Sequence, residues 1–318
     1  MCLTKMFHKK LISIILPTYN GSRFIRDSIE SIIKQTYKNW ELIIVDDCST
    51  DDTLTILKEY EKQDSRIHVI SNLVNKKLPA SLNVGFQYAK GEYWTWTSDD
   101  NIYKEDAIEY MTNYLNKNSD VDLLSCNFDI VTEDLVFICS KCDTYQRDVA
   151  QLAVENQVGA CFMYTRNVAN RIGEYDTSMF CAEDYDYWCR IAKVGKIAYD
   201  DGKSLYIYRQ NSKSLTETKK NEVIEKTYSV WRKHSNDILN NVGYNTAKKC
   251  QIFFELYYRS GKNREWLELA KKEDFLYYLT KLVKRGISKI TKNIFSIRNE
   301  GNKKIFRLLG FKIKIRKK

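Results

Sequence analysis

Residues 11–20 read LISIILPTYN and residues 41–51 read ELIIVDDCSTD, and these two stretches decide the fold class. Each is a short, continuous apolar run that ends in polar residues, which is typical of a parallel strand buried on both faces. Between them, Ile25, Ile29 and Ile32 recur at the spacing of a buried helix face. The order strand, helix, strand predicts a βαβ unit.

The same alternation continues to residue 97. A helical pattern containing Leu54 and Leu57 precedes an apolar run at residues 67–70, and a second helical pattern at residues 80–90 precedes EYWTWT at residues 92–97. Right-handed βαβ connections of this kind build one sheet with helices on both faces. The sequence therefore predicts an α/β fold with a doubly wound, mostly parallel sheet flanked by helices.

Changes of pattern along the chain predict three regions. Residues 10–215 carry the α/β pattern, which becomes richer in strands after residue 121. Residues 216–299 are predicted as a helical C-terminal region. Residues 300–318 are predicted as a basic amphipathic tail, because eight Lys or Arg residues and no acid follow Gly301, interleaved with apolar residues.

Composition excludes several classes of protein. Only 2 prolines and 12 glycines exclude collagen-like and Pro/Gly-rich disordered chains. No apolar run is long enough for a signal peptide or a membrane span, so a cytoplasmic protein with reduced cysteines is expected. The CxxC at Cys139 and Cys142 has no second ligand pair, which argues against a zinc site.

Charge is divided unequally between the two parts of the chain. Residues 1–218 hold 25 Lys and Arg against 32 Asp and Glu, a net charge of −7, whereas residues 219–318 hold 26 against 9, a net charge of +17. The acidic part argues against nucleic-acid binding by the whole protein, so no nucleic-acid partner is predicted. The basic part predicts a contact with a polyanion or an anionic membrane surface.

Carboxylates follow two of the predicted strands directly. Asp46 and Asp47 end the second strand, and Asp99 and Asp100 end the fourth. Ligands of open α/β sheets bind outside the carboxyl ends of the strands. Neither a GxGxxG nor a GxxxxGK[ST] loop is present, so the phosphates of a nucleotide ligand are expected to be held through a divalent cation.

Five motifs in this order resemble those of the family 2 glycosyltransferases, an inverting group with the GT-A fold. The motifs are residues 14–20 (IILPTYN), residues 35–37 with 41–51 (QTY and ELIIVDDCSTD), residues 98–101 (SDDN), residues 159–176 with IGEYD at their end, and residues 183–188 (EDYDYW). The resemblance spans about residues 10–212.

The resemblance implies roles for the donor-side residues. Pro17, Tyr19 and Asn20 would line the nucleoside pocket, and Asp47 would hydrogen-bond the base. Asp99 would contact the ribose or the sugar.

The resemblance also implies a metal ligand and a base. Asp100 would bind Mn²⁺ or Mg²⁺ bridging the diphosphate, and Asp184 would be the catalytic base. Glu183 and Trp96 are candidates for the acceptor side, although Trp96 could equally be packed in the core. Asn211 stands where many relatives have a histidine, which leaves a third contact to the metal or diphosphate open.

The function expected from the resemblance is transfer of a single hexose or N-acetylhexosamine, with inversion. The donor would be a nucleotide diphosphate sugar, UDP-linked, and the acceptor a hydroxyl of a glycan or a polyprenyl-linked oligosaccharide. Capsule or lipopolysaccharide biosynthesis at the inner face of the plasma membrane would fit the basic tail. The alternatives are a sugar-phosphate nucleotidyltransferase and an inactive, membrane-associated carbohydrate-binding or scaffold protein.

Overall fold

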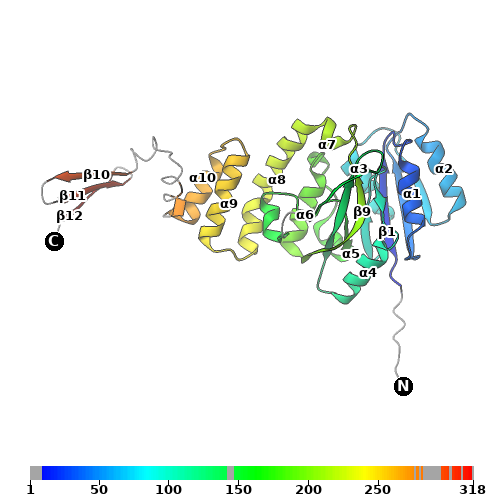
Figure 1. The fold of residues 1–318 in the computed structure, drawn as a ribbon, viewed down its shortest axis with the longest axis horizontal. Helices are drawn as coiled ribbons and strands as arrows, with labels where there is room; N and C mark the ends of the chain where they lie inside the picture. Colours follow the sequence, from blue (N-terminus) through cyan, green and yellow to red (C-terminus); the bar gives the residue numbers. More distant parts are fainter. Residues whose placement is uncertain are drawn as a thin grey trace, which may run out of the picture. The chain divides into compact units, whose positions relative to one another are not determined.

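The computed structural model describes residues 9–141, 147–275, 277, 278, 281, 295–300, 303–308 and 311–316. Within it the chain divides into two compact units, Met1–Val242 and Gly243–Lys318. Figure 1 shows both units with their elements labelled. The predicted site residues all belong to the first unit.

A mixed sheet of nine strands forms the centre of the first unit. Its strand order is β3-β2-β1-β4-β8-β6-β9-β5, and β7 pairs with β6. The strands are β1 (Ile12–Thr18), β2 (Trp40–Asp46), β3 (Ile67–Ser71), β4 (Tyr93–Trp96), β5 (Ile102–Tyr103), β6 (Leu123–Val131), β7 (Phe137–Ser140), β8 (Phe162–Thr165) and β9 (Ile197–Arg209).

The half of the sheet built by the first hundred residues is parallel. β2 pairs in parallel with β1 and β3, and β1 pairs in parallel with β4. All residues of β1 and β2 are buried, as expected of strands covered on both faces. The α/β fold predicted from the sequence is confirmed.

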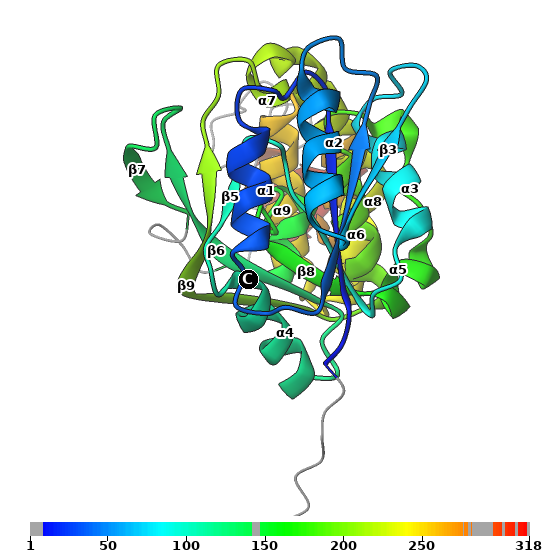
Figure 2. The ribbon, with the colours of Figure 1, turned by 90° about the vertical axis from the view of Figure 1, so that its right-hand side faces the viewer.

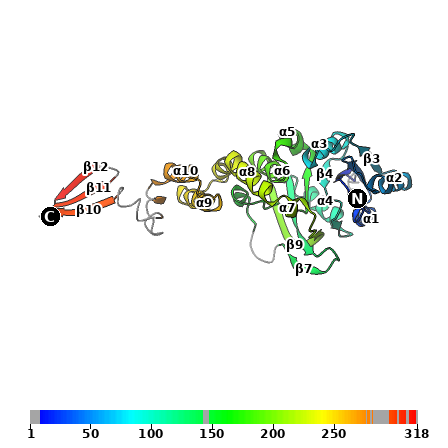
Figure 3. The same ribbon diagram turned by 90° about the horizontal axis from the view of Figure 1, so that it is seen from above.

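The other half of the sheet is mixed. β8 runs antiparallel to both β4 and β6, and β5 runs antiparallel to β9, whereas β6 and β9 are parallel. β7 lies at the edge away from β3, as Figures 2 and 3 show. The mostly parallel arrangement therefore describes residues 12–96, and the strand-rich part that follows adds antiparallel pairs.

Helices cover the sheet of the first unit, and Figure 2 shows α1 and α2 side by side in front of it. In α1, Ile25, Ile29 and Ile32 are fully buried, so the predicted helix face is confirmed. The helices are α1 (Ile25–Ile33), α2 (Thr53–Gln63), α3 (Leu78–Tyr88), α4 (Ala107–Lys117), η1 (Val149–Ala153), α5 (Arg166–Ile172), η2 (Thr177–Met179), α6 (Glu183–Val194), α7 (Leu215–Thr218) and α8 (Lys220–Asn241).

Helix α8 belongs to the first unit, although the sequence placed a boundary between residues 215 and 216. The carboxylate of Asp186 in α6 is completely buried and accepts hydrogen bonds from Lys233 Nζ and His234 Nε2 of α8, both at 2.8 Å. The side chain of Ser235 donates to the carbonyl of Ala153 in η1 at 2.5 Å. These contacts join α8 to the first unit, which ends at Val242. Composition does not reveal them, because the paired residues are distant in the sequence.

The second unit begins with two helices, α9 (Thr246–Arg259) and α10 (Glu265–Glu273), as predicted for this region. The rings of Phe253 and Trp266 stack between them, with centroids 6.2 Å apart.

Three antiparallel strands follow, β10 (Phe295–Glu300), β11 (Lys303–Leu308) and β12 (Phe311–Arg316). The prediction of helix up to residue 299 is wrong at β10. Apolar residues alternate there at the period of a strand, with Phe295 opposite Leu308 and Ile297 opposite Phe306.

None of the described helices is both long enough and apolar enough to cross a membrane.

Candidate functional site

A cavity of about 860 Å³ opens at the carboxyl ends of β1, β2 and β4. The turns that leave these three strands meet there, as expected for a ligand site of an α/β sheet. All nine predicted site residues line this one cavity: Pro17, Tyr19, Asn20, Asp47, Trp96, Asp99, Asp100, Glu183 and Asp184. The structure thus brings together residues from separate sequence motifs, while the role of each stays a prediction.

Asp47 organises the loop that borders the cavity after β3. One of its carboxylate oxygens accepts hydrogen bonds from Asn72 Nδ2 and the backbone N–H of Lys76, and the other accepts from the N–H of Lys77, each at 2.8 Å. Three donors hold the carboxylate in one orientation, and only 4% of the residue is exposed. Asn72 was not identified from the sequence, since a lone Asn after a strand has no distinctive spacing.

Asp99 lies against the turn after β1. Thr18 Oγ1 donates to Asp99 Oδ2 at 2.5 Å, and a Cβ added to Gly21 would come within 2.2 Å of the same oxygen. A glycine is therefore needed at residue 21 for this approach. Burial, reinforced by the charge of Asp100, raises the pKa of Asp99 to about 7.

Asp100 is oriented from two sides. Ser98 Oγ donates to Asp100 Oδ1 at 2.6 Å, and Asn211 Nδ2 lies 3.5 Å from Asp100 Oδ2. The Oδ1 atom of Asn211 accepts the N–H of Lys213 at 2.8 Å, so the amide presents its NH₂ group to Asp100. An NH₂ group does not ligate a cation, so in this geometry Asn211 faces Asp100 as a hydrogen-bond donor.

The donor set suits a cation that the substrate helps to bind. In the described part of the chain, no three His, Cys, Asp or Glu side chains gather as a ready metal site. Mg²⁺ and Mn²⁺ are commonly held by one or two carboxylates together with substrate phosphates. Asp100 fits that mode, with phosphate oxygens completing the ligands. Cys139 is half-buried, and Cys142 of the CxxC lies outside the described residues.

Glu183 and Asp184 begin helix α6 at the edge of the cavity. Asp184 is half-buried; its Oδ1 accepts the N–H of Tyr185 at 2.6 Å and its Oδ2 accepts Asn156 Nδ2 at 2.8 Å. Burial raises the pKa of Asp184, and the two hydrogen bonds lower it. A carboxyl in a cavity whose pKa is altered by burial and by specific hydrogen bonds is a candidate proton acceptor.

Glu183 is more deeply buried than Asp184. Its Oε2 atom has no hydrogen-bond partner among the described residues, although the side chain lines the cavity. Burial and the adjacent charge of Asp184 raise the pKa of Glu183 to about 8. The two carboxyls therefore differ in their ease of ionisation.

Trp96 is shared between the cavity and an aromatic cluster. Its Nε1 donates to Tyr175 Oη at 3.0 Å, and its ring meets that of Phe162 edge to face at 5.5 Å. The residue nevertheless lines the cavity. Trp96 is thus held rigidly with part of its ring facing the cavity.

The cavity is also lined by five cationic residues that the sequence motifs did not identify: Arg23, Lys77, Lys141, Lys213 and Lys219. They come from separate loops, so no spacing in the sequence connects them. A cavity with both carboxylates and cations can hold a phosphorylated ligand and a metal ion together.

Three of the six non-glycine residues with positive φ in the described part of the chain line this cavity. Asn20, Lys77 and Cys181 line it and have φ values of 57°, 69° and 76°, in the left-handed region that L residues rarely adopt. Such residues persist where the surrounding contacts hold them, and they cluster at binding sites. In Asn20 the side-chain oxygen accepts the N–H of Thr50 at 2.7 Å.

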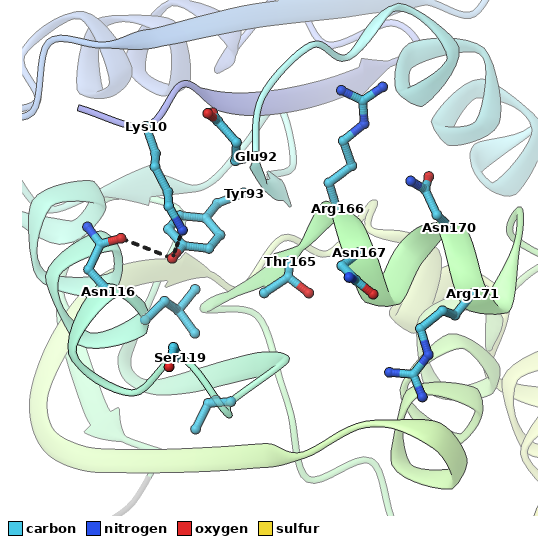
Figure 4. Close-up of a pocket in the computed structure, with 12 residues that line it drawn as sticks. Lys10, Glu92, Tyr93, Asn116, Ser119, Thr165, Arg166, Asn167, Asn170 and Arg171 are labelled. Atoms are coloured by element: carbon cyan, nitrogen blue, oxygen red, sulfur yellow. Dashed lines mark hydrogen bonds between the residues drawn. The ribbon is translucent and has the colours of Figure 1, made fainter. Parts of the chain in front are cut away.

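A second depression, of about 590 Å³, has a different character. Figure 4 shows it between the start of β1, the end of α4 and helix α5. Lys10 Nζ donates a hydrogen bond to Tyr93 Oη at 2.7 Å, and Tyr93 Oη donates one to Asn116 Oδ1 at 3.0 Å. The carboxylate of this depression, Glu92, already accepts the N–H of Leu11. No predicted site residue lines this depression.

The architecture is that of the GT-A glycosyltransferases. Staphylococcus aureus TarS, residues 1–349 in complex with UDP-GlcNAc, superimposes with a TM-score of 0.55 at 14% identity, covering 96% of this chain and 99% of that one. The mannosyltransferase PcManGT of Pyrobaculum calidifontis, in complex with GDP-Man and Mn²⁺, gives a TM-score of 0.58 at 15% identity, covering 89% of this chain and 81% of that one. At these identities the similarity establishes the fold.

The chain belongs to glycosyl transferase family 2, whose family model matches residues 13–173. The uncharacterized glycosyltransferase RP339 of Rickettsia prowazekii is 31% identical over 227 residues, covering 69% of this chain and 70% of RP339. The putative teichuronic acid biosynthesis glycosyltransferase TuaG of Bacillus subtilis is 29% identical over 226 residues, covering 70% of this chain and 88% of TuaG. The resemblance seen in the motifs is thereby confirmed, and the protein is a glycosyltransferase.

Proposed function

We propose that this protein transfers a single hexose or N-acetylhexosamine from a UDP-linked donor to an acceptor hydroxyl, with inversion and with the help of Mn²⁺ or Mg²⁺. The observation that carries the proposal is the convergence of Asp47, Asp99, Asp100 and Asp184 on one cavity. The cavity is large enough for a nucleotide sugar, since sites of about 300–1,000 Å³ hold ligands of this size.

The donor would lie across the turns after β1, β2 and β4. Tyr19, which is 50% exposed, offers a ring face for the base, and the oriented carboxylate of Asp47 offers an acceptor. The complex of TarS with UDP-GlcNAc is compatible with a UDP-linked donor here. PcManGT binds GDP-Man instead, so a panel of donors is needed to test the choice.

Metal and cations would share the charge of the diphosphate leaving group. A divalent cation bound by Asp100 and the phosphates would neutralise the charge that develops as the glycosidic bond breaks. Lys213 and Lys219, which line the cavity together with Asn211, would add fixed positive charge. The Mn²⁺ bound in the PcManGT complex is compatible with such a requirement.

Asp184 would act as the base. A sugar hydroxyl is a weak nucleophile, and a positioned carboxylate that accepts its proton accelerates the attack by about 10²–10⁴-fold. In-line attack opposite the diphosphate inverts the anomeric carbon, so one base suffices and no covalent intermediate is needed. Glu183, with its pKa raised to about 8, would be protonated at neutral pH and could donate a hydrogen bond to the acceptor.

The first test is release of nucleotide diphosphate from UDP-, GDP- and dTDP-sugars. We expect turnover of a UDP-sugar with Mn²⁺, its loss with EDTA, and at least about a hundredfold reduction in Asp100→Ala, since the variant removes a contact to developing charge. Asp120→Ala is the matched control, because Asp120 is an exposed carboxylate paired with Lys196. Equal turnover in Asp100→Ala and Asp120→Ala would contradict the metal role.

The two alternatives predict different outcomes in the same test. A sugar-phosphate nucleotidyltransferase would form a nucleotide sugar from a sugar phosphate, and the turn at Thr18, Tyr19, Asn20 and Gly21 lacks the Gly-rich loop expected for that reaction. An inactive carbohydrate-binding or scaffold protein would release nothing from any donor and would not bind UDP with Mn²⁺. The family membership and the intact carboxylates favour transfer.

The acceptor is proposed to be a growing surface polysaccharide, of the capsule or lipopolysaccharide kind, on a polyprenyl carrier. The name of TuaG associates that relative with teichuronic acid biosynthesis, another surface polysaccharide. Such an acceptor would place the enzyme in the cytoplasm, at the inner face of the plasma membrane.

The basic amphipathic tail, residues 300–318, is proposed to hold the enzyme at the membrane. Residues 301–318 hold eight Lys or Arg and no acidic residue. Each cation near an anionic lipid surface contributes about 1 kcal/mol of binding free energy.

Deletion of residues 301–318 is expected to release the protein from anionic lipid vesicles. Replacing Lys312, Lys314 and Arg316 by Ser should weaken binding by roughly a hundredfold, because each cation contributes about 1 kcal/mol near such a surface. Sedimentation with phosphatidylglycerol vesicles, compared with neutral phosphatidylcholine vesicles, measures this. Undiminished sedimentation of the deletion variant would refute membrane attachment through these residues.

A further inference from the structure

The segment Arg147–Val158, called the strap below, is held by hydrogen bonds to helix α6 and strand β6. Near its middle, Tyr185 Oη donates to the carbonyl of Leu152 at 2.7 Å. At its end, Ser125 Oγ donates to the carbonyl of Val158 at 2.5 Å, and at its start the buried guanidinium of Arg147 donates to Ser125 Oγ at 2.5 Å. Tyr185, which follows Asp184, and Ser125 of strand β6 thus hold this segment in place.

Asn156 is the strap residue that contacts Asp184. Its Nδ2 donates to Asp184 Oδ2 at 2.8 Å, while its Oδ1 accepts the backbone N–H of Val158 at 3.3 Å and that of Gly159 at 3.5 Å. Backbone N–H groups only donate, so they determine which end of the amide is oxygen. The NH₂ group of Asn156 must therefore face the carboxylate.

We propose that Asn156 is a positioning residue that holds Asp184 ionised and correctly oriented as the base. A neutral NH₂ donor stabilises the carboxylate and not the protonated acid, and it leaves the remaining lone pairs of Asp184 for the acceptor hydroxyl. The proposal rests on the proposed function, since it assumes that Asp184 accepts the proton.

Other groups near Asp184 do not replace this contact. Among the described residues, the titratable side chains with an electrostatic interaction with Asp184 include Glu183 and Cys189 on its own helix, Tyr175 from the loop before η2 and Tyr208 from β9. Each is an acid that would repel the carboxylate when ionised.

The cations that line the same cavity, Arg23, Lys77, Lys141, Lys213 and Lys219, form no ion pair with Asp184 among the described residues. Without the Asn156 donor, the rise that burial causes in the pKa of Asp184 would be opposed mainly by the hydrogen bond from the N–H of Tyr185.

Two variants separate positioning from loop structure. Asn156→Asp retains an oxygen that accepts the N–H of Val158 but replaces the NH₂ donor by a second carboxylate oxygen. Asn156→Ala removes both contacts. Gln151→Ala is the control, because Gln151 is exposed on the same strap.

The expected result is a shift of the acidic limb of the pH–rate profile to higher pH, larger in Asn156→Asp than in Asn156→Ala. A hydrogen bond to a charged acceptor corresponds to about a tenfold change in the ionisation constant, so the acidic limb should move up by about one pH unit. The rate is nucleotide diphosphate release from the donor identified in the panel above. Gln151→Ala should retain the wild-type profile.

A second readout does not depend on activity. In protein labelled with carboxyl-¹³C aspartate, the resonance absent from Asp184→Asn reports the ionisation of Asp184. Its titration should move to higher pH in both Asn156 variants, and an unchanged titration would overturn the proposal. If the titration moves but Asp184→Asn retains full activity, the positioning contact stands and the proposed function of Asp184 fails.

Discussion

Asp184→Asn is expected to lower kcat for sugar transfer by about 10²–10⁴-fold, because an amide accepts no proton from the acceptor hydroxyl. The substitution keeps the shape of the side chain, and its Oδ1 can still accept the N–H of Tyr185. Binding of UDP with Mn²⁺, measured by calorimetry, should be nearly unchanged, since the proposed donor contacts lie at Tyr19, Asp47 and Asp100. The loss should thus appear in kcat and not in nucleotide affinity.

Glu183→Gln is the matched comparison for this prediction. Glu183 precedes Asp184 on the same helix end, and an amide there can still donate a hydrogen bond to an acceptor. We expect a smaller loss in Glu183→Gln than in Asp184→Asn, measured with the same donor and acceptor. The reverse order would identify Glu183 as the base.

Asp186→Asn is expected to destabilise the first unit by about 2–3 kcal/mol, because a completely buried carboxylate that accepts three charge-assisted hydrogen bonds is lost. The Asp186 carboxylate is completely buried and accepts hydrogen bonds from Arg190 Nε at 2.9 Å and from Lys233 and His234 at 2.8 Å. Urea unfolding followed by tryptophan fluorescence measures the change.

Asp237→Asn provides the control on helix α8. Asp237 pairs with Lys193 at 2.7 Å, but its side chain is 55% exposed, so its loss should cost less than about 1 kcal/mol. Similar midpoints for Asp186→Asn and Asp237→Asn would show that the buried network contributes little.

The contribution of Asp186 to the stability of the fold should decrease at low pH. Burial by itself would raise the pKa of Asp186, but hydrogen bonds from His234 and Lys233 outweigh burial and hold the pKa well below its usual value. A carboxyl with a lowered pKa stabilises the fold fully above its unfolded pKa of about 3.9 and loses that contribution as the pH falls further. The difference between wild type and Asp186→Asn should therefore narrow only below about pH 4.

The predicted strands and the predicted site residues that follow them came from local pattern. Apolar runs such as residues 11–16 and 42–45 are best buried as strands of a covered sheet, and the turns after them carry the polar residues. Parallel strands bring their carboxyl ends to one edge, so Asp47 and Asp99 had to lie near each other. The placement of these two residues needed no information beyond strand order.

Other residues could not be predicted because their partners are distant in the chain. Asn156 meets Asp184 across 28 positions, and Asp186 meets His234 across 48. An isolated Asn or His has no periodicity that marks it, since only the packing of η1 and α8 on α6 brings it close. The extent of the first compact unit to Val242 depends in the same way on distant contacts, because the buried carboxylate of Asp186 in α6 pairs with Lys233 and His234 of α8.

Strand pattern and motif order were sufficient for the α/β architecture, the family and the nine predicted residues of the cavity, because these depend on periodicity and on residues adjacent in the chain. The five cations that also line the cavity come from separate loops and were found only in the structure. Tertiary contacts were required to see that burial raises the pKa values of Glu183 and Asp99 and so favours their protonated forms. They were also required for the orientation of Asp184 by Asn156 and of Asp100 by Asn211. Burial and hydrogen-bond direction are properties of the packed chain, because they depend on which distant groups exclude water or supply a donor.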